Sequence, residues 1–296
     1  MMTPNHILVG TDFDERGALT EGSANAARHA LRLAEQCGAK VDFVHSTHRS
    51  GEDSTIHGDL NVGRAELAKL QAESAAVTSE LVLDDRRPAL ALIQHVGSGS
   101  HDLVVVAKRN HRRRDDRKLG SVSMMLLRMC PCPVWVIKPE QEMAHNAIAA
   151  ATDLSAVGDL AIQYGALLAN YEPCKLFAVH AWQLPLELQM SHSRIGDEEF
   201  RKGTQQIIDA ATRHIRAIPA FAELGERGKV LLANSTPSAA ILELVEKQNP
   251  DLVVLGTVSR GGISGFLIGN TAEKLLYKLD CSLLAIKPDD FISPVS

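Results

Sequence analysis

The sequence predicts an α/β protein built from two tandem domains, each a parallel sheet covered by helices on both faces. Three observations predict it: the chain repeats itself once, short β-branched runs alternate with longer helical stretches within each copy, and the length suits two domains. A chain of 296 residues with 45% hydrophobic content can bury a sizeable core. We therefore place the first domain at residues 1–140 and the second at 141–296.

The repeat is clearest in the C-terminal half of each copy. "HDLVVVAKRN" at 101 matches "PDLVVLGTVS" at 250, and Gly120 and Lys138 stand 149 positions before Gly269 and Lys287. The N-terminal halves match more loosely, with "ILVGTDF" at 7 facing "IAAATDL" at 148 and "VDFVHS" at 41 facing "LFAVHA" at 176. The changing offset places the length variation in the N-terminal halves, ahead of the third strand.

The second copy gives the clearest order of elements. A helix begins after the first strand, with Leu160, Tyr164, Leu167 and Leu168 on one face, and another begins at Pro237, which suits a first helical position. Further helices are expected near 197–217 and from about 271. Strands are expected at 147–152, 175–180, 229–233, 252–256 and 282–286.

Composition excludes several classes of partner. The net charge of -5 gives no bulk electrostatic reason to expect nucleic acid or an anionic membrane. The start of the sequence lacks a basic stretch followed by an apolar one, and no run approaches the ~18 apolar residues of a membrane span. The five cysteines are scattered and odd in number, which favours a reducing compartment. We expect a cytoplasmic protein.

The most informative loop is the glycine-rich stretch at 256–271, ahead of a predicted helix. In an open doubly wound sheet the ligand crevice lies at the carboxyl ends of the strands, where strand order reverses. Asp153 ends the first strand and the loop follows the fourth, so both would line one cleft. Glycines allow close backbone approach, and a helix N-terminus favours an anion. The alternative is a plain surface loop capped by Asn270, with Glu273 completing a capping box.

These motifs together resemble the universal stress proteins. The resemblance rests on "TDF" or "TDL" after the first strand, a His closing the second, a loop of the form Gly-x2-Gly-x9-Gly-(Ser/Thr), and "PVWVIKP" as the last strand. It covers nearly the whole chain, twice, and "GNTAE" after the loop is similar to the tandem E-type members. The resemblance implies two flavodoxin-like, doubly wound five-stranded sheets of order 3-2-1-4-5, paired through their fifth strands as an intramolecular pseudo-dimer.

The resemblance also implies an adenine-nucleotide site in the second copy. The first-strand Asp would face the nucleoside and the loop would hold ribose and phosphates. ATP is the expected ligand, with Mg²⁺ as a candidate companion. The second copy keeps two motif glycines but has Ser259 and Asn270 at the other two positions. The predicted nucleotide-binding residues are Thr152, Asp153, Ala181, Gly256, Ser259, Arg260, Gly269, Asn270 and Thr271.

The first copy departs further from the motif. It has Ala107 and Asn110 in place of the first two glycines, and its spacer is the charged run "HRRRDDRKL", most simply a solvated face. Arg112, Arg113 and Arg114 are alternative ligands for a phosphate or an acidic partner. The weaker candidate residues of this copy are Asp12, Gly120 and Ser121.

No catalytic constellation is evident. His45 and His180, at strand ends, are expected to orient backbone or to pack, and the sequence shows no GxSxG, HExxH or Cys-His arrangement. A metal site at His48, His57 and the acidic stretch 51–59 is weaker than loop composition as an explanation, and "CPCP" is expected to pack rather than bind metal or react. The apolar stretch after Trp182 is expected to close a core or an interface. We predict no metal site and no committed enzymatic turnover.

The expected function is a stress-response module that senses ATP or a related nucleotide and acts through protein partners or as a homodimer. ATP is expected to order the loop 257–270 and so change the surface shown to a partner. The alternative is a scaffold that has lost nucleotide binding and holds another small anionic or lipid-like ligand. A third class, the adenine-nucleotide hydrolases, is disfavoured because no SGGxDS loop follows a first strand.

Overall fold

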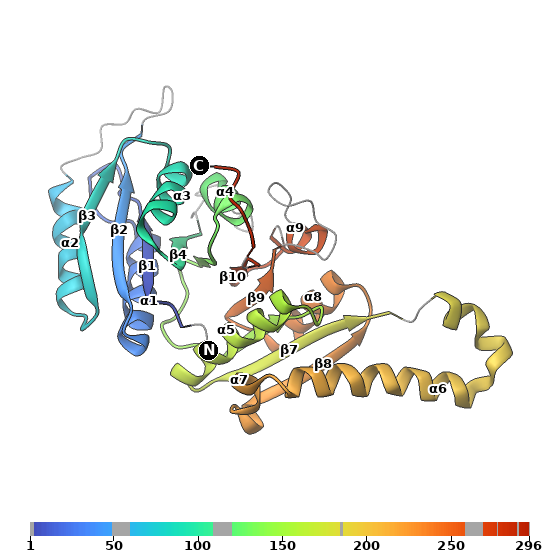
Figure 1. Ribbon diagram of the computed structural model, residues 1–296. Coiled ribbons are helices and arrows are strands. Elements are labelled where there is room, and N and C mark those ends of the chain that lie inside the picture. Colours follow the sequence, from blue (N-terminus) through green and yellow to red (C-terminus); the bar gives the residue numbers. More distant parts are fainter. Residues whose placement is uncertain are drawn as a thin grey trace. The chain divides into compact units, whose positions relative to one another are not determined.

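The computed structural model describes residues 3–48, 60–108, 120–183, 186–257, 269–276, 278–288 and 290–295 (Figure 1). The chain divides into two compact units. One unit holds residues 145–256. The other holds residues 2–144 together with 257–296, so the last segment of the second sequence copy packs with the first copy.

The unit that contains the first copy is built on a predominantly parallel sheet. Its strands lie in the order β3-β2-β1-β4-β5, followed by β10. The pairs from β3 to β5 are parallel, as alternating βα units predict. The strands are β1 (His6–Thr11), β2 (Lys40–Ser46), β3 (Val77–Asp84), β4 (Leu103–Ala107), β5 (Val134–Ile137) and β10 (Ser282–Ile286).

Helices connect these strands and pack on the sheet. The first lies against β1 and β4, and the third lies against β1 and β2. Thr20 caps the first helix by accepting a hydrogen bond from the Ser23 N–H, and Gly38 ends it in the left-handed conformation. The helices of this unit are α1 (Glu21–Cys37), α2 (Asn61–Ala72), α3 (Pro88–Gly99), α4 (Ser121–Met129) and α9 (Asn270–Leu276).

The fifth strands of the two copies meet in this unit, as the resemblance implies. β10 runs antiparallel to β5, with Leu284 opposite Trp135. At the end of the pair the buried Ser282 hydroxyl accepts a hydrogen bond from the Lys138 N–H (2.9 Å) and donates one to Gln141 Oε1 (3.1 Å). The apolar runs "VWVI" and "SLLAI" are buried at every position. The C-terminal strand is therefore part of the same core as Trp135.

The second unit repeats the central part of this arrangement. Its strands lie in the order β9-β6-β7-β8 and are parallel. Helix α5 packs on β6 and β9, as α1 does on β1 and β4. The strands are β6 (Ala147–Ala151), β7 (Lys175–Trp182), β8 (Gly228–Asn234) and β9 (Leu252–Gly256); the helices are α5 (Ala156–Tyr171), α6 (Leu186–Arg216), α7 (Pro219–Ala222) and α8 (Pro237–Gln248), with a short 3₁₀ turn at Gly225–Arg227.

One predicted element is longer than expected. The helix expected near 197–217 is α6, which begins at Leu186, so the apolar segment after Trp182 is largely helical. The side chains of residues 186–197 lie outside the described part of the structure, and the prediction that they close a core or an interface stays a prediction. Among the described helices, none is both long and apolar enough to cross a membrane.

Candidate functional site

In the second unit, three neighbouring strands end at one edge of the sheet. β6 lies between β9 and β7, and strand order reverses at this point. Thr152 follows β6 directly; its N–H donates to the Val179 carbonyl (3.0 Å) and its hydroxyl accepts from the Leu154 N–H (2.9 Å). Ala181 lies half-buried near the end of β7, opposite Ala233. The predicted residues Thr152 and Ala181 therefore lie at the carboxyl ends of neighbouring strands.

The predicted role of the two strand-end histidines is confirmed. The His180 ring nitrogen Nδ1 lies 2.9 Å from the Thr152 carbonyl oxygen, and His45 Nδ1 lies 3.0 Å from the Thr11 carbonyl oxygen. A carbonyl only accepts, so each Nδ1 carries the hydrogen. Each ring thus ties the second strand of its copy to the end of the first.

Asp153 lies exposed in a tight turn. The turn Asp153–Ser155 leads straight into α5, with Leu154 at a φ of 63°. Asp153 Oδ1 accepts a hydrogen bond from the Ser155 N–H (3.1 Å), and Ser155 caps the helix by accepting from the Gly158 N–H. The carboxylate is therefore held at the strand edge on a short, capped connection.

The structure gives Gly256 a packing reason that the sequence did not suggest. A Cβ added to Gly256 would lie 2.7 Å from Val157 Cγ1 in the first turn of α5. In the first copy the equivalent strand residue is Ala107, and the helix residue that faces it is Gly22, whose added Cβ would lie 3.1 Å from Ala107 Cβ. The small and large residues have exchanged places between the copies.

The remaining residues of the predicted second-copy site are divided. Gly269 and the start of α9 belong to the other unit. The Gly269 N–H donates to the Thr257 carbonyl (2.7 Å), and its own carbonyl accepts from the Glu273 N–H (3.0 Å), so Gly269 is the residue before the helix. Ser259 and Arg260 lie outside the described residues, as do the side chains of Asn270 and Thr271.

The capping box that the alternative interpretation placed at this helix is wrong. α9 already begins at Asn270, so Asn270 is helical and does not precede the helix. The Glu273 carboxylate forms an ion pair with Arg128 (3.2 Å), a residue of α4. The physical reason is that Gly269 takes the cap position, since a glycine carries no side chain that must fit there.

In the first copy, a longer connection covers the equivalent edge. Nine residues, 12–20, join β1 to α1, and within them Phe13 is only 3% exposed. Phe13 stands edge-on to the His45 ring, with centroids 4.6 Å apart. A Cβ on Gly63 of α2 would lie 2.1 Å from the Phe13 ring, and the Leu19 N–H donates to Glu66 of the same helix (2.7 Å). The connection is therefore fixed against α2.

The first-copy candidates lie around this connection. Asp12 is exposed, and its carboxylate accepts from the Phe13 N–H (3.1 Å). Gly120 is the buried residue before α4, and Ser121 is exposed as the first residue of that helix. The charged run and Asn110 lie outside the described residues, so a phosphate or acidic partner for Arg112, Arg113 and Arg114 stays a prediction.

Comparison with known proteins settles the family. The model of the universal stress protein family matches residues 4–138 and again 145–287. The chain belongs to the universal stress protein family. It is 31% identical to universal stress protein E of Salmonella typhi and of Escherichia coli K12, with 91% of this chain and 92% of each relative covered.

Solved structures agree on the fold of this universal stress protein. A functionally unknown protein from Pseudomonas aeruginosa PAO1 superposes with a TM-score of 0.73 at 22% identity, covering 97% of this chain and 94% of that one. A universal stress protein from Archaeoglobus fulgidus gives a TM-score of 0.61 at 16% identity, covering 97% and 99%. The tandem α/β fold predicted from the sequence is confirmed.

The structure describes only part of the metal and thiol candidates that the sequence analysis considered. His48 Nδ1 lies 3.1 Å from the Asp85 carbonyl oxygen, while His57 and residues 51–59 lie outside the described part. The thiols of Cys130 and Cys132 are buried with their sulfurs 3.6 Å apart.

Sequence reasoning missed one cluster, formed by His6, Asp42 and His101. In the described part of the chain, the ligand atoms of these three side chains lie close enough together to bind one metal ion. Comparison of the two copies could have found it, because the second copy has apolar residues at the equivalent positions. These residues are Ala147, Phe177 and Pro250.

Proposed function

We propose that this chain binds ATP or a related adenine nucleotide in its second copy and acts as a sensor or regulatory module without committed turnover. One observation carries the proposal: Thr152 and Asp153 stand at the point where strand order reverses, between β6 and β9. In doubly wound sheets, ligands bind outside the carboxyl ends of the strands at this point. Family membership supports the same choice of ligand, which the sequence motif suggested.

The difference between the copies favours the second one. In the first copy, Phe13 is buried against His45 and Gly63 at the ends of β1 and β2. The second copy has only the short turn Asp153–Ser155, and Asp153 is exposed. A nucleoside at the first copy would have to displace a buried aromatic ring, which costs several kcal/mol by the scale of large-to-small changes in cores. We therefore assign the nucleotide to the second copy.

Calorimetric titration of ATP into the full chain tests the proposal, with a matched pair of variants. Asp153→Ala removes the carboxylate at the proposed site, and Asp12→Ala removes its repeat equivalent. We expect one ATP per chain in the wild type. Loss of a hydrogen bond to a charged group costs roughly 1.5–3 kcal/mol, so Asp153→Ala should weaken binding by about tenfold or more. Asp12→Ala should bind as the wild type does.

Two outcomes contradict this assignment. Equal weakening by both variants would place nucleotide in both copies, and weakening by Asp12→Ala alone would place it in the first. Absence of ATP binding to the wild type, with and without Mg²⁺, favours the scaffold alternative. Mass spectrometry of ligand that co-purifies with the chain would then identify the anionic or lipid-like molecule.

Regulation and turnover have separate tests. If ATP orders residues 257–270, their amides should exchange hydrogen more slowly at saturating ATP, whereas identical exchange would refute this mode of sensing. Release of phosphate or pyrophosphate at steady state tests turnover. We expect rates no greater than those of Asp153→Ala, because the sequence supplies no recognisable nucleophile and base at this edge.

A further inference from the structure

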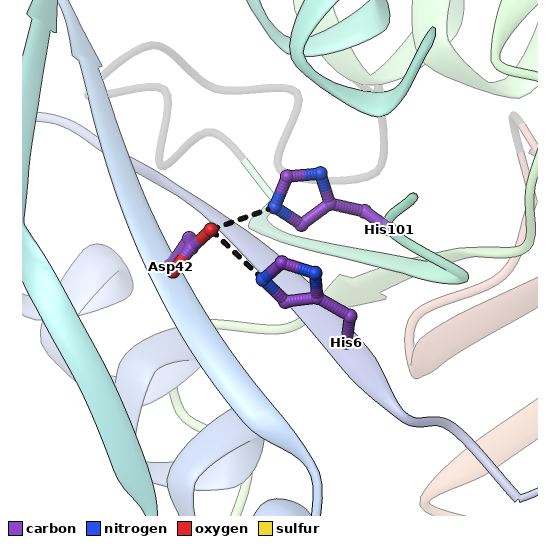
Figure 2. A group of neighbouring side chains, drawn as sticks. All are labelled: His6, Asp42 and His101. Atoms are coloured by element: carbon purple, nitrogen blue, oxygen red, sulfur yellow. Dashed lines mark hydrogen bonds and ion pairs between the residues drawn. The ribbon is translucent and has the colours of Figure 1, made fainter. Parts of the chain in front are cut away.

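A cluster of two imidazoles and one carboxylate lies at the amino end of the first sheet (Figure 2). His6 is the first residue of β1, Asp42 is in β2, and His101 precedes β4. The Nε2 atoms of His6 and His101 lie 2.8 and 3.0 Å from the same oxygen, Asp42 Oδ2. The three possible ligand atoms lie within 4.8 Å of one another, and the two rings are tilted by 36° with centroids 4.0 Å apart.

The hydrogen bonds of His101 indicate that a cation belongs in this cluster. His101 Nδ1 lies 3.1 Å from the His95 carbonyl oxygen, which can only accept, so Nδ1 carries a hydrogen. A neutral His101 then presents the Nε2 lone pair to the Asp42 carboxylate oxygen. Two lone pairs 3.0 Å apart repel, so either a proton or a metal ion must lie between them. Metal-binding histidines adopt the same arrangement, in which one ring nitrogen donates its hydrogen to a carbonyl and the other nitrogen binds the metal.

Charge and burial suit an ion that enters from solvent. The His101 side chain is 4% exposed, whereas His6 and Asp42 are 21% and 29% exposed. Asp42 supplies a carboxylate oxygen to both rings, and one side of the cluster remains accessible to solvent.

The second copy shows that the fold does not need these polar side chains. The equivalent positions hold Ala147, Phe177 and Pro250, all buried. The backbone around them is arranged alike: Asp102 accepts from the His6 N–H, and Asp251 accepts from the Ala147 N–H. Apolar side chains thus close this corner of the sheet well in one copy. Burying polar groups there in the other copy costs free energy that a bound ligand would offset.

We propose that His6, Asp42 and His101 bind a divalent transition-metal ion, with Zn²⁺ as the representative. Two imidazoles and a carboxylate are suitable ligands for Zn²⁺, at about 2.0–2.2 Å. Tetrahedral ligands at this distance are separated by roughly 3.4 Å, so the two N···O pairs need to open by only about half an ångström. Three protein ligands leave a fourth position for water or another ligand. The ion would join β1, β2 and the turn before β4.

This site is separate from the proposed nucleotide site. It lies at the amino end of β1 in the first copy, whereas the proposed nucleotide site follows β6 in the second copy. Its presence therefore does not depend on nucleotide binding. The ion would stabilise the folded unit, because it binds residues that come together only on folding.

Titration of the tag-free full chain with Zn²⁺ and Co²⁺, in a buffer with a non-thiol reductant, tests the proposal. We expect one ion per chain, a rise in the midpoint of thermal unfolding, and Co²⁺ absorption in the visible range. Asp42→Asn and His101→Gln should each weaken binding by at least about 100-fold, since even the loss of an outer partner costs about 10–100-fold. His6→Gln, at a half-exposed ligand, provides a third variant that should keep the fold.

His214→Gln is the matched control. His214 Nε2 lies 2.8 Å from Asp159 Oδ1, a His–carboxylate pair in the other unit that forms no three-ligand group among the described residues. Its affinity for Zn²⁺ should equal that of the wild type. The proposal is overturned if the wild type binds no ion at micromolar concentration. It is equally overturned if folded Asp42→Asn and His6→Gln bind as tightly as the wild type, which would assign the ion to other histidines or thiols.

Discussion

At the scale of single residues, Lys287 is a charged side chain in a buried environment. Its side chain is 4% exposed, and the ammonium donates to the Leu127 carbonyl near the end of α4. The Phe291 ring lies below it, with the nitrogen 4.5 Å from the centroid. Burial removes water from the charge and lowers the pKa of Lys287 to about 8, although Cys130 and Cys132 oppose this shift. The lysine therefore titrates close to neutral pH.

The stability of the wild type relative to Lys287→Met should rise with pH. Because the folded pKa of about 8 lies below the ordinary 10.5, the unfolded chain holds this proton more tightly between the two values. Unfolding free energy therefore increases from pH 8 to 10.5 in the wild type by an amount on the order of 3 kcal/mol that the Met variant lacks. Urea unfolding at stepped pH measures the difference.

The two thiols near this ammonium need a control. Placing both proteins in a Cys130→Ala, Cys132→Ala background keeps thiol ionisation out of the subtraction. Lys138→Met, at the repeat-equivalent position beside Asp280, controls for removal of a lysine. A pH-independent difference between wild type and Lys287→Met would show that the lysine is not buried as a charge.

At the scale of elements, helix and strand fit together through exchanged small residues. Where α5 meets β9, the pair is Val157 and Gly256. Where α1 meets β4, the pair is Gly22 and Ala107. Each contact has room for one larger side chain, supplied by the helix in one copy and by the strand in the other. Close packing in protein interiors explains why both positions cannot be large at once.

A double-mutant cycle measures this fit. Gly256→Ala should destabilise the chain by roughly 1–3 kcal/mol, because the new methyl would lie 2.7 Å from Val157 Cγ1. Val157→Ala removes that atom, so the double variant should be more stable than the sum of the single effects by about 0.5–3 kcal/mol. Chemical unfolding of the four proteins provides the cycle.

The control for this cycle is a glycine with open space around it. A Cβ on Gly97, in α3, meets nothing within 4 Å. Gly97→Ala should therefore be neutral or stabilise the helix by up to about 1 kcal/mol. Additive effects of Gly256→Ala and Val157→Ala would mean that the glycine serves another purpose, such as approach of a ligand.

Elements were predicted well where their periodicity is local. The strands at 147–151, 252–256 and 282–286 and the helix from Pro237 follow from short windows of sequence. The covering role of Phe13 was not predictable, because its contacts with His45 and Gly63 join segments 32 and 50 positions away. The ligand role of His6, Asp42 and His101 depends on the same kind of long-range contact. Gly256 was interpreted by motif alone, and its partner Val157 lies 99 positions away in the sequence.

At the scale of the whole molecule, the repeat in the sequence and the packing of the chain divide differently. The family match places residues 145–287 in one copy, whereas α9 and β10 pack with residues 2–144. The contact between β5 and β10 accounts for the difference, because it joins the fifth strands of both copies. The boundary at residue 140 stays a prediction, and the compact units group β10 with residues 2–144.

Two tryptophans make this division measurable. Trp135 is buried in β5 beside β10, and Trp182 is half-buried at the end of β7 in the other unit. Ser282→Ala removes the hydroxyl that accepts from the Lys138 N–H, and an unsatisfied buried donor costs about 1–3 kcal/mol. In Trp182→Phe, where fluorescence reports Trp135, this substitution should lower the urea midpoint. In Trp135→Phe, where fluorescence reports residues 145–256, the midpoint should change less.

The two urea midpoints show whether β10 is stabilised together with the first copy, as the packing indicates, or together with the second copy, as the sequence order would suggest. Ser282 belongs to the second sequence copy. If each sequence copy folded as an independent unit, Ser282→Ala would lower the urea midpoint reported by Trp182 more than the midpoint reported by Trp135. A larger shift at Trp182 than at Trp135 would contradict the grouping of β10 with the first copy. A larger shift at Trp135 would show that the first copy depends on the C-terminal strand of the second for its stability. The copies could then not be separated at residue 140 without loss of that stability, since the cut would leave the apolar β5 without its antiparallel neighbour.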